Sequence, residues 1–509
     1  WAVTAAQDTE APAPVWARPW VAAAVVAAMI AVKLAFAANT NLVADEAYYA
    51  LWSWFPGIGY YDHPAMVAWL IAAGRAVAGD GEVGVRLASV LGIAVVSAAL
   101  YRTGTILFAS RATAALAVIW YNLTPAAAIG FFVITPDVPS VVFWTLAIWA
   151  AAEFVRSRNR HWWLAVGLAA GLGLASKYTN LFLGGGLLLW LLADRERRTW
   201  FGHWQLWAGG ALALALFAPV IWWNAQHGWS SFDLQFGRSA RMLAGEITRG
   251  GNPGEFAGGQ LVLVLPPLFA LIVTGAVLYA SNWPGWPRHA AALPVLTGAP
   301  VIAYFMAHSA FSWVEVNWTM PVWPAFCLLG AAVAVSLTPA GRLGQALLVA
   351  SRASQLPLAL VVVGVLYAQA ALPWVSVVGA RRTAELHGWP QAQQQIARLA
   401  EENGARWIAT RSSYGLNALL FYYGRLAGDP LPVRSVDQPY RYTFLPPIET
   451  EPFAAQTALL VVRVSGKNAP DAGAGFADVL FLGTVSREWG GVPRDTFALF
   501  LVPGLGGGE

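Results

Sequence analysis

The stretch DEAYYALWSWFPGIGYYDHP, residues 45–64, follows a long apolar segment directly and decides how the rest of the chain is interpreted. Asp45 and Glu46 stand at its start, beside an expected membrane span, and Asp62 and His63 stand near its end. Charged side chains at a bilayer are costly unless they pair with one another or serve a function. Two acidic clusters separated by Trp and Tyr therefore predict a functional site at the membrane surface.

The composition of the chain indicates a membrane protein. Of 509 residues, 58% are hydrophobic and 11% are charged, whereas about 25% of a soluble domain is charged. The net charge of +4 does not point to nucleic acid, because no basic run is interleaved with aromatic residues. The single cysteine, Cys327, excludes a disulfide within the chain.

Apolar runs near the length of a bilayer crossing predict about eleven transmembrane helices. The first run lacks a convincing cleavage site, so we interpret it as a retained helix rather than a signal peptide. The expected spans are 17–38, 83–108, 112–133, 138–156, 162–176, 178–193, 205–223, 258–280, 290–308, 318–337 and 355–375.

Arginine falls on alternate connections between these spans, which predicts the orientation of the chain. Five arginine-bearing connections would share the cytoplasmic side with the N-terminus. They carry Arg102 and Arg111; Arg156, Arg158 and Arg160; Arg195, Arg197 and Arg198; Arg288; and Arg342 and Arg352. The opposite, outer side then receives 39–82, 135–137, 176–179, 224–257, 312–317 and the C-terminal tail.

The composition becomes more polar from about Ser376 onward. Short β-type runs such as RWIAT and ALLVVRV alternate there with helical patterns at 391–403 and 414–423. We therefore expect a transmembrane domain over 1–375, with an outer loop at 39–82, and a small soluble α/β domain over 376–509.

Several candidate residues also have plain structural interpretations. Asp45 could simply cap the helix AYYALWSWF, which we expect to lie in the membrane interface as a short amphipathic helix. Asp62, His63 and His227 could bind a metal, although their spacing matches no metal signature.

Two further positions keep a structural alternative. Asp137, followed by Val138 and Pro139, resembles a helix start. Lys177 lies between two apolar runs, where it either reaches the lipid headgroups or binds an anion such as a phosphate. The arginines of the loop 224–257, among them Arg238, could be solvated individually. Together these groups offer carboxylates for acid–base chemistry and cations for a phosphate.

The motifs DEAYYALWSW, GYYDHPAMVAWL, TPDVP, LASKYT, WNAQHGWSSF and the NW of EVNW occur in this order. They resemble the GT-C class of membrane glycosyltransferases that use polyprenyl-phosphate sugars. Within that class the chain is similar to the dolichyl-phosphate-mannose–protein mannosyltransferase-like group, which includes the aminoarabinose and galacturonic acid transferases of lipid A. The resemblance covers residues 17–375, and the C-terminal domain is similar only in kind.

This resemblance implies a GT-C fold and an inverting transfer of sugar from a polyprenyl-phosphate donor to an acceptor hydroxyl on a glycolipid, glycan or protein. It implies no nucleotide or other required cofactor, and it is compatible with a divalent metal. Asp45 takes the position of the catalytic carboxylate and Asp62 that of the second acidic residue. His63 departs from the family, because aminoarabinose transferases carry a lysine there. The expected substrate-binding residues are Glu46, Tyr61, His63, Asp137, Lys177, Tyr178, His227, Arg238, Glu315 and Asn317.

Two other classes of protein compete with this interpretation. A transporter or flippase would also have many helices and buried charges, but its charges concentrate near the membrane midplane and often follow an inverted repeat. A structural or chaperone-like membrane protein would not need five charged residues on one face. Both alternatives remain open at this point.

Overall fold

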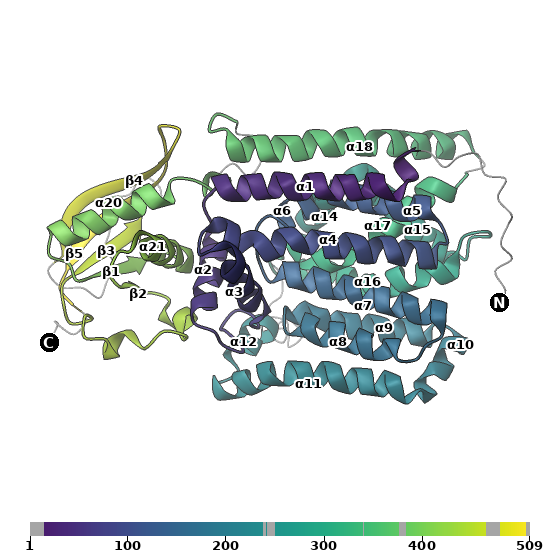
Figure 1. Cartoon of the computed structure of the whole chain (residues 1–509), viewed down its shortest axis with the longest axis horizontal. Helices are drawn as coiled ribbons and strands as arrows, with labels where there is room; N and C mark the ends of the chain where they lie inside the picture. Colours follow the sequence, from purple (N-terminus) through teal and green to yellow (C-terminus); the bar gives the residue numbers. More distant parts are fainter. Residues whose placement is uncertain are drawn as a thin grey trace.

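The chain forms a helical bundle with a sheet domain at one end, as the computed structural model in Figure 1 shows. The structure describes residues 15–237, 241, 250–338, 341–375, 383–464 and 479–504. Helices α2 (Ala44–Trp54) and α3 (Met66–Ala78) lie between the long helices and the sheet domain. The domain boundary expected at 375/376 adjoins 376–382, which lie outside the described residues.

Seven helical segments in the described residues are long and apolar enough to cross a membrane, which makes the chain a multi-pass membrane protein. They are α1 (Pro19–Asn39), α4 (Glu82–Leu107), α7 (Asp137–Ser157), α11 (Trp204–Gln226), α16 (Arg288–His308), Val316–Ser336 (η5, Val316–Val322, with α17, Trp323–Ser336) and α18 (Arg342–Ala371). An eighth would combine α14 (Pro253–Val264) and α15 (Pro266–Ala280), which meet at a bend of 104°. Length and composition therefore do not confirm eleven spans.

Local sequence explains why some expected spans are shorter or broken. The run 112–133 divides into α5 (Arg111–Asn122) and α6 (Pro125–Gly130), because Thr124 caps α6 and Pro125 follows as its first residue. The bend at Leu265 precedes Pro266, whose backbone lacks a hydrogen-bond donor. Helices α8 (Trp162–Leu174) and η2–α9 (Tyr178–Leu192) are short, as expected, and Lys177 between them is extended.

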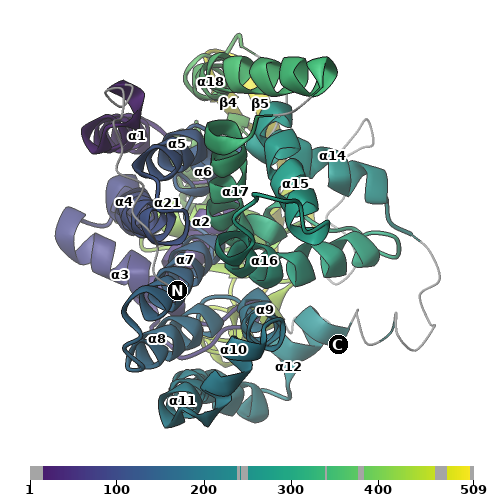
Figure 2. The same cartoon turned by 90° about the vertical axis from the view of Figure 1, so that its right-hand side faces the viewer.

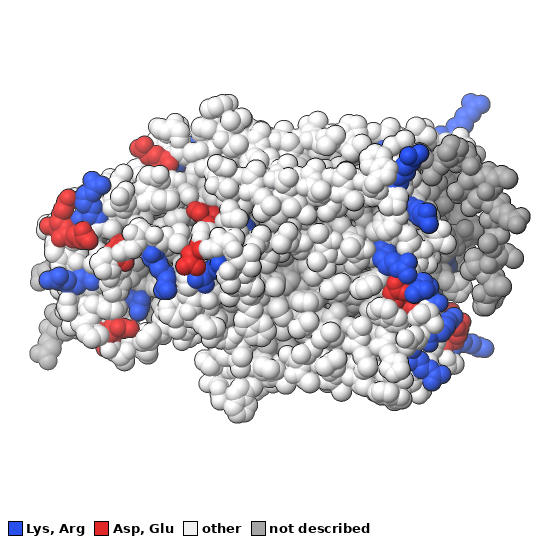
Figure 3. Space-filling model, in the orientation of Figure 1, with Lys and Arg blue, Asp and Glu red and all other residues white. Residues whose placement is uncertain are grey.

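The helices pack around α4, α7 and α17, while α11 and α18 lie at opposite edges of the bundle (Figure 2). Small residues allow close approach: a Cβ atom on Gly167 of α8 would come within 2.1 Å of the Gly209 carbonyl of α11. Figure 3 shows charged side chains near both ends of the molecule and an uncharged band between them. The arginine-rich helix α10 (Arg195–Arg198) lies at the end opposite the sheet domain (Figure 1).

The C-terminal domain is the predicted α/β unit. Its five-stranded sheet has the order β2-β1-β3-β5-β4, in which β1 pairs in parallel with β2 and β3, and β5 pairs antiparallel with β3 and β4. The strands are β1 (Trp407–Arg411), β2 (Val433–Ser435), β3 (Ala458–Arg463), β4 (Leu480–Trp489) and β5 (Val492–Val502), and the helices are α20 (Trp389–Glu402) and α21 (Tyr414–Ala427).

Helix α2 forms as expected, and protein elements rather than solvent or lipid surround it. Its residues 46–53 are all buried, because α21 covers one side of α2 while α3 packs against another. The contact with α21 is so close that a Cβ atom on Gly415 would lie 2.5 Å from the Cβ of Ala44. Helix α2 is thus the layer on which the two parts of the molecule meet.

Candidate active site

Neighbouring residues Asp45 and Glu46 have different surroundings. The N-cap residue of α2 is Val43, and the Glu46 carboxylate closes the first turn by accepting a hydrogen bond from the Val43 N–H (3.1 Å). Asp45 instead accepts a hydrogen bond of 2.5 Å from the hydroxyl of Tyr414, in the first turn of α21. Capping therefore does not account for Asp45.

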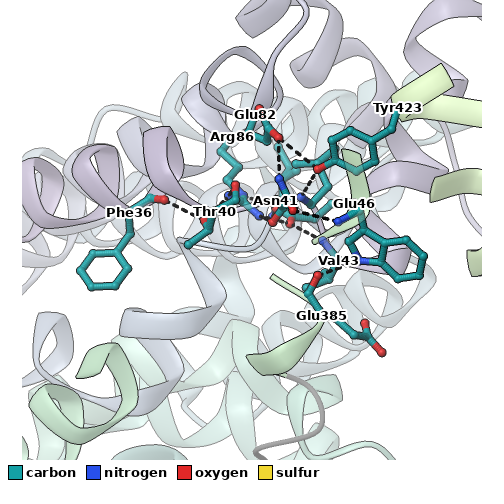
Figure 4. A network of polar contacts seen from close by, with 12 residues as sticks. Phe36, Thr40, Asn41, Val43, Glu46, Glu82, Arg86, Glu385 and Tyr423 are labelled. Carbon is teal, nitrogen blue, oxygen red and sulfur yellow. Dashed lines mark hydrogen bonds and ion pairs between the residues drawn. The ribbon is translucent and has the colours of Figure 1, made fainter. Parts of the chain in front are cut away.

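Glu46 forms a completely buried ion pair with Arg86 of α4 (Figure 4). The Arg86 Nε and Nη2 donate to its two oxygens at 2.8 and 2.6 Å, and the Ile134 N–H donates at 3.1 Å. Arg86 also donates to the carbonyls of Thr40 and Asn41. This network joins α1, α2, α4 and the segment before α7, and every oxygen of Glu46 has a partner.

The same region is tied to the C-terminal domain. The Tyr423 hydroxyl of α21 accepts from the Leu42 N–H at 2.7 Å and donates to Glu82 at 3.0 Å (Figure 4). The Asn41 N–H donates to the carbonyl of Leu386 at 2.7 Å. These hydrogen bonds hold α21 against the first outer loop and so place Tyr414 beside Asp45.

Asp62 lies at the second contact between the loop and the C-terminal domain. One of its carboxylate oxygens accepts a hydrogen bond from the Tyr48 hydroxyl at 2.8 Å, and the other pairs with the guanidinium of Arg441. Arg441 belongs to the short helix η6 (Pro439–Tyr442) and packs over the ring of Tyr414 at 4.5 Å. The Gln235 side chain donates to the Asp62 carbonyl at 2.9 Å.

Asp137, Lys177 and Asn317 come from three different connections between helices and meet in one cluster. The Lys177 ammonium donates to Asp137 at 2.6 Å, and the Asn317 amide donates to the other carboxylate oxygen at 2.8 Å. Lys177 is only 6% exposed, so its ammonium does not extend to the lipid headgroups. The interpretation of Lys177 as a residue that reaches the headgroups is therefore wrong.

The charges of the three carboxylates all act on Tyr49 of α2. Burial raises the pKa of the Tyr49 phenol well above its usual value, and the nearby charges of Asp45, Asp62 and Asp137 raise this pKa further. A single hydroxyl thus feels all three charges. We call Asp45, Asp62 and Asp137, with their partners Tyr414, Arg441 and Lys177, the three-carboxylate site.

Charge in this site is distributed unevenly. Burial raises the pKa of Asp62, although Arg441 and the Tyr48 hydroxyl act in the opposite direction. Burial, together with the charges of Lys177 and Arg441, lowers the pKa of His63 to about 3. His63 is therefore neutral at physiological pH, and the cationic groups of the described site are Lys177 and Arg441.

The remaining expected residues lie around this site or away from it. The Tyr61 ring packs against Tyr440 at 5.0 Å, and Glu315 lies in the same outer connection as Asn317. Tyr178 is buried, with its hydroxyl 2.8 Å from that of Ser231, and Arg238 lies outside the described residues.

His227 is exposed and stacks on Trp223 with ring centres 4.0 Å apart. It lines a hollow of about 390 Å³ together with Tyr60 and Phe444. Within the described part of the chain, no three His, Cys, Asp or Glu side chains approach one another closely enough to hold a metal ion. The weak metal candidates Asp62, His63 and His227 therefore gain no further ligand there.

Sequence reasoning missed the contribution of the C-terminal domain. Tyr414 and Arg441 contact Asp45 and Asp62, yet each is more than 360 residues away along the chain. The one available signal was the run PYRY at 439–442, an arginine flanked by tyrosines in a domain without other recognised motifs.

Comparisons with known proteins agree with the resemblance predicted from the motifs. The family model described as dolichyl-phosphate-mannose-protein mannosyltransferase matches residues 62–223. The lipid A galacturonosyltransferase RgtD of Rhizobium johnstonii is 26% identical over 222 residues, which are 41% of this chain and 46% of that protein. The undecaprenyl phosphate-alpha-4-amino-4-deoxy-L-arabinose arabinosyl transferase of Pseudomonas aeruginosa is 29% identical over 236 residues, 43% of this chain and 41% of that enzyme. The chain thus matches less than half the length of either relative.

The fold is similar to that of ArnT from Cupriavidus metallidurans over nearly the whole of both chains. The apo structure gives a TM-score of 0.62 at 16% identity and covers 94% of this chain and 97% of ArnT. The structure of ArnT bound to undecaprenyl phosphate gives the same score and covers 96% and 99%. The predicted GT-C fold with a small C-terminal domain is confirmed.

Proposed function

We propose that this protein is an inverting glycosyltransferase that moves a sugar from a polyprenyl-phosphate donor to an acceptor hydroxyl. The main support is the three-carboxylate site, which brings acid–base groups and a lysine together where the bundle ends. Two matched relatives are named as a lipid A galacturonosyltransferase and an undecaprenyl-phosphate-sugar transferase. In this proposal residues 1–375 form the catalytic membrane domain, and 376–509 form a domain on the outer side.

Asp45 is the base in the proposed reaction. It would accept the proton of the acceptor hydroxyl as that oxygen attacks the anomeric carbon and the lipid phosphate leaves. The Tyr414 hydroxyl at 2.5 Å fixes the direction of the carboxylate, and orientation of this kind is a requirement for general-base catalysis. Asp62, held by Tyr48, would orient the acceptor or the sugar.

Lys177 is the proposed cation for the leaving phosphate. Charge develops on the phosphate as the glycosidic bond breaks, and fixed cations stabilise it. Lys177 is held by Asp137 at 2.6 Å, and it would keep that contact while donating its remaining hydrogens to phosphate oxygens. Arg238 is a second candidate on sequence grounds, and the neutral His63 would hydrogen-bond a sugar hydroxyl.

The other expected residues take supporting roles in this proposal. Tyr61, His227, Glu315 and Asn317 would contact substrate or shape its approach. Glu46 and Tyr178 are buried and hydrogen-bonded within the protein, so we assign them to positioning rather than to contact with substrate. The described residues do not fit a metal site, and the mechanism contains no step through a metal.

The acceptor is a glycolipid such as lipid A, a glycan or a protein, and the donor lipid is a polyprenol such as undecaprenol. The competing function, transport of a lipid-linked or small polar substrate, gains no specific support. The charged groups of the site lie together beside the C-terminal domain rather than along the length of the bundle.

The direct test uses purified protein in lipid nanodiscs with a panel of polyprenyl-phosphate sugars and candidate acceptors. We expect release of polyprenyl phosphate with one donor class, accompanied by a glycosylated acceptor. Movement of the donor between leaflets without release of polyprenyl phosphate would favour a flippase and reject the transferase.

The proposed orientation has its own test. We place the three-carboxylate site on the periplasmic side of a bacterial inner membrane, because the arginine-rich connections mark the cytoplasmic side. The test uses two cysteine variants, Ile58→Cys in the segment that precedes Asp62 and Asn159→Cys on an arginine-rich connection. Both native residues are exposed, and the native Cys327 is buried. In intact cells an impermeant thiol reagent should label only the first variant, and the reverse pattern would contradict the orientation.

A further inference from the structure

The C-terminal domain contributes a charged residue to the three-carboxylate site. Arg441 lies in η6 of that domain, and its guanidinium pairs with Asp62 of the first outer loop. The Arg441 carbonyl also lies 2.8 Å from the Tyr48 hydroxyl, which shares its one hydrogen between this carbonyl and Asp62. Arg441 is therefore bound to the site through both its side chain and its backbone.

The surroundings of Arg441 hold its guanidinium in a fixed plane. It lies over three tyrosine rings, at 4.5 Å from Tyr414, 5.6 Å from Tyr61 and 6.0 Å from Tyr440. Tyr414 is also the residue that donates to Asp45. Arg441 thus pairs with Asp62 directly and contacts Tyr414, the partner of Asp45. A planar guanidinium can stack on a ring and bind a carboxylate at the same time, which an ammonium cannot do.

The Arg441 side chain is not sealed inside the protein. It is 20% exposed, and its Nε–H has no hydrogen-bond partner among the described residues. By contrast, the Arg86 side chain paired with Glu46 is completely buried. The Asp62–Arg441 pair is therefore less enclosed than the Glu46–Arg86 pair.

We propose that Arg441 is a positioning residue through which the C-terminal domain completes the active site, by holding Asp62 in the orientation that the transfer reaction needs. The inference rests on the proposed transferase function. It assigns a role in the reaction to a domain in which sequence reasoning placed no site residue. Arg441 acts through Asp62 and needs no contact with the reacting atoms.

The test compares Arg441→Gln, Arg441→Lys, Asp62→Asn and the double variant Asp62→Asn/Arg441→Gln in lipid nanodiscs. We expect Arg441→Gln to lower kcat about ten- to a hundredfold, the range that loss of one charge-assisted hydrogen bond gives, with KM for the lipid donor changed less. Arg441→Lys should be intermediate. The double variant should be no slower than the slower single variant, because residues that act as a unit lose their effect together.

Arg425→Met is the matched control. Arg425 is an exposed arginine of the same domain whose guanidinium stacks on Trp54 at 4.6 Å, away from the three carboxylates. Its turnover should equal that of the unmodified protein. An equal loss in this control would show that any interface arginine matters and would overturn the inference.

Three other outcomes would also overturn it: an Arg441→Gln rate within twofold of the unmodified protein, full activity of Arg441→Lys, or losses that multiply in the double variant. Thermal melts identify variants that fail to fold. If Arg441→Gln fails to fold, the activity of Arg441→Lys decides whether the inference stands. If the unmodified protein releases no polyprenyl phosphate from any donor, the transferase function itself is rejected, which is a distinct result.

Discussion

Two ion pairs, each between an acidic residue of the segment 39–82 and an arginine outside the same helix, have different surroundings. Glu46 and Arg86 are completely buried, both oxygens of Glu46 are bonded, and four backbone groups complete the network. Asp62 and Arg441 are partly exposed and keep an unused donor. The difference shows that closeness to the site does not define the role of a residue: the first pair is enclosed within the fold, and the second is partly open beside Tyr414, the partner of Asp45.

The comparison also separates two adjacent residues. Successive residues of a helix point about 100° apart, so Glu46 turns toward α4 while Asp45 turns toward α21. The predictions below test this division, beginning with the largest expected effect.

Asp45→Asn should lower the rate of sugar transfer roughly 10²–10⁴-fold, the usual contribution of a general base. Asparagine keeps the size of the side chain and can still accept the Tyr414 hydrogen bond, so the melting temperature should change little. Turnover and melting are measured on the same preparation. Asp80→Asn, which changes an exposed carboxylate of the same outer segment, serves as the control and should keep full activity. A normal rate in Asp45→Asn would remove Asp45 from the mechanism.

Arg86→Met should destabilise the protein by about 3–5 kcal/mol, because it leaves the buried Glu46 carboxylate without its partner. The double variant Glu46→Gln/Arg86→Met should recover part of that loss. Thermal melts in detergent provide the measurement. Arg158→Met breaks the pair with Glu196, in which both side chains are 56% exposed, and it should cost no more than about 1 kcal/mol. Equal losses in the two single variants would contradict a special role for the buried pair.

Lys177→Met should lower the rate of sugar transfer roughly ten- to a hundredfold, because a charge-assisted hydrogen bond to phosphate contributes about 1.5–3 kcal/mol. It also leaves Asp137 unpaired, so it should be destabilising. Adding Asp137→Asn removes the unpaired charge and should restore the melting temperature without restoring activity. If the double variant regains the full rate, Lys177 serves only to neutralise Asp137.

His63 should make the protein less stable in mild acid. Its pKa of about 3 lies below the value near 6.5 of an unfolded histidine. The unfolded chain therefore takes up a proton as pH falls below 6.5, while the folded chain does not, and stability decreases by at most about 2 kcal/mol between pH 7 and 5. Between pH 7 and pH 5, the melting temperature of His63→Gln should decrease less than that of the unmodified protein. Equal losses would mean that His63 is protonated in the folded state.

Much of this protein can be predicted from its sequence, because the membrane imposes simple local rules. Apolar length marks seven or eight of the eleven expected spans, and arginine falls on alternate connections of the predicted topology. The polar residues whose burial near a membrane is unfavourable, and which the spans and arginine-rich connections do not explain, include Asp45, Asp62, Asp137, Lys177 and Asn317. The structure brings all five to one region. The strands and helices of the C-terminal domain also follow from local periodicity.

Other features depend on contacts between distant segments, which a local pattern does not contain. Only the folded chain shows that Glu46 belongs to a buried network with Arg86, that α2 is covered by α21, and that Lys177 donates to Asp137. The same holds for Tyr414 and Arg441, which reach the site only when the sheet domain packs on the bundle. The sequence determined which charges this protein carries near the membrane, and the tertiary structure decided their partners, because the energy of a buried charge depends on what surrounds it in space.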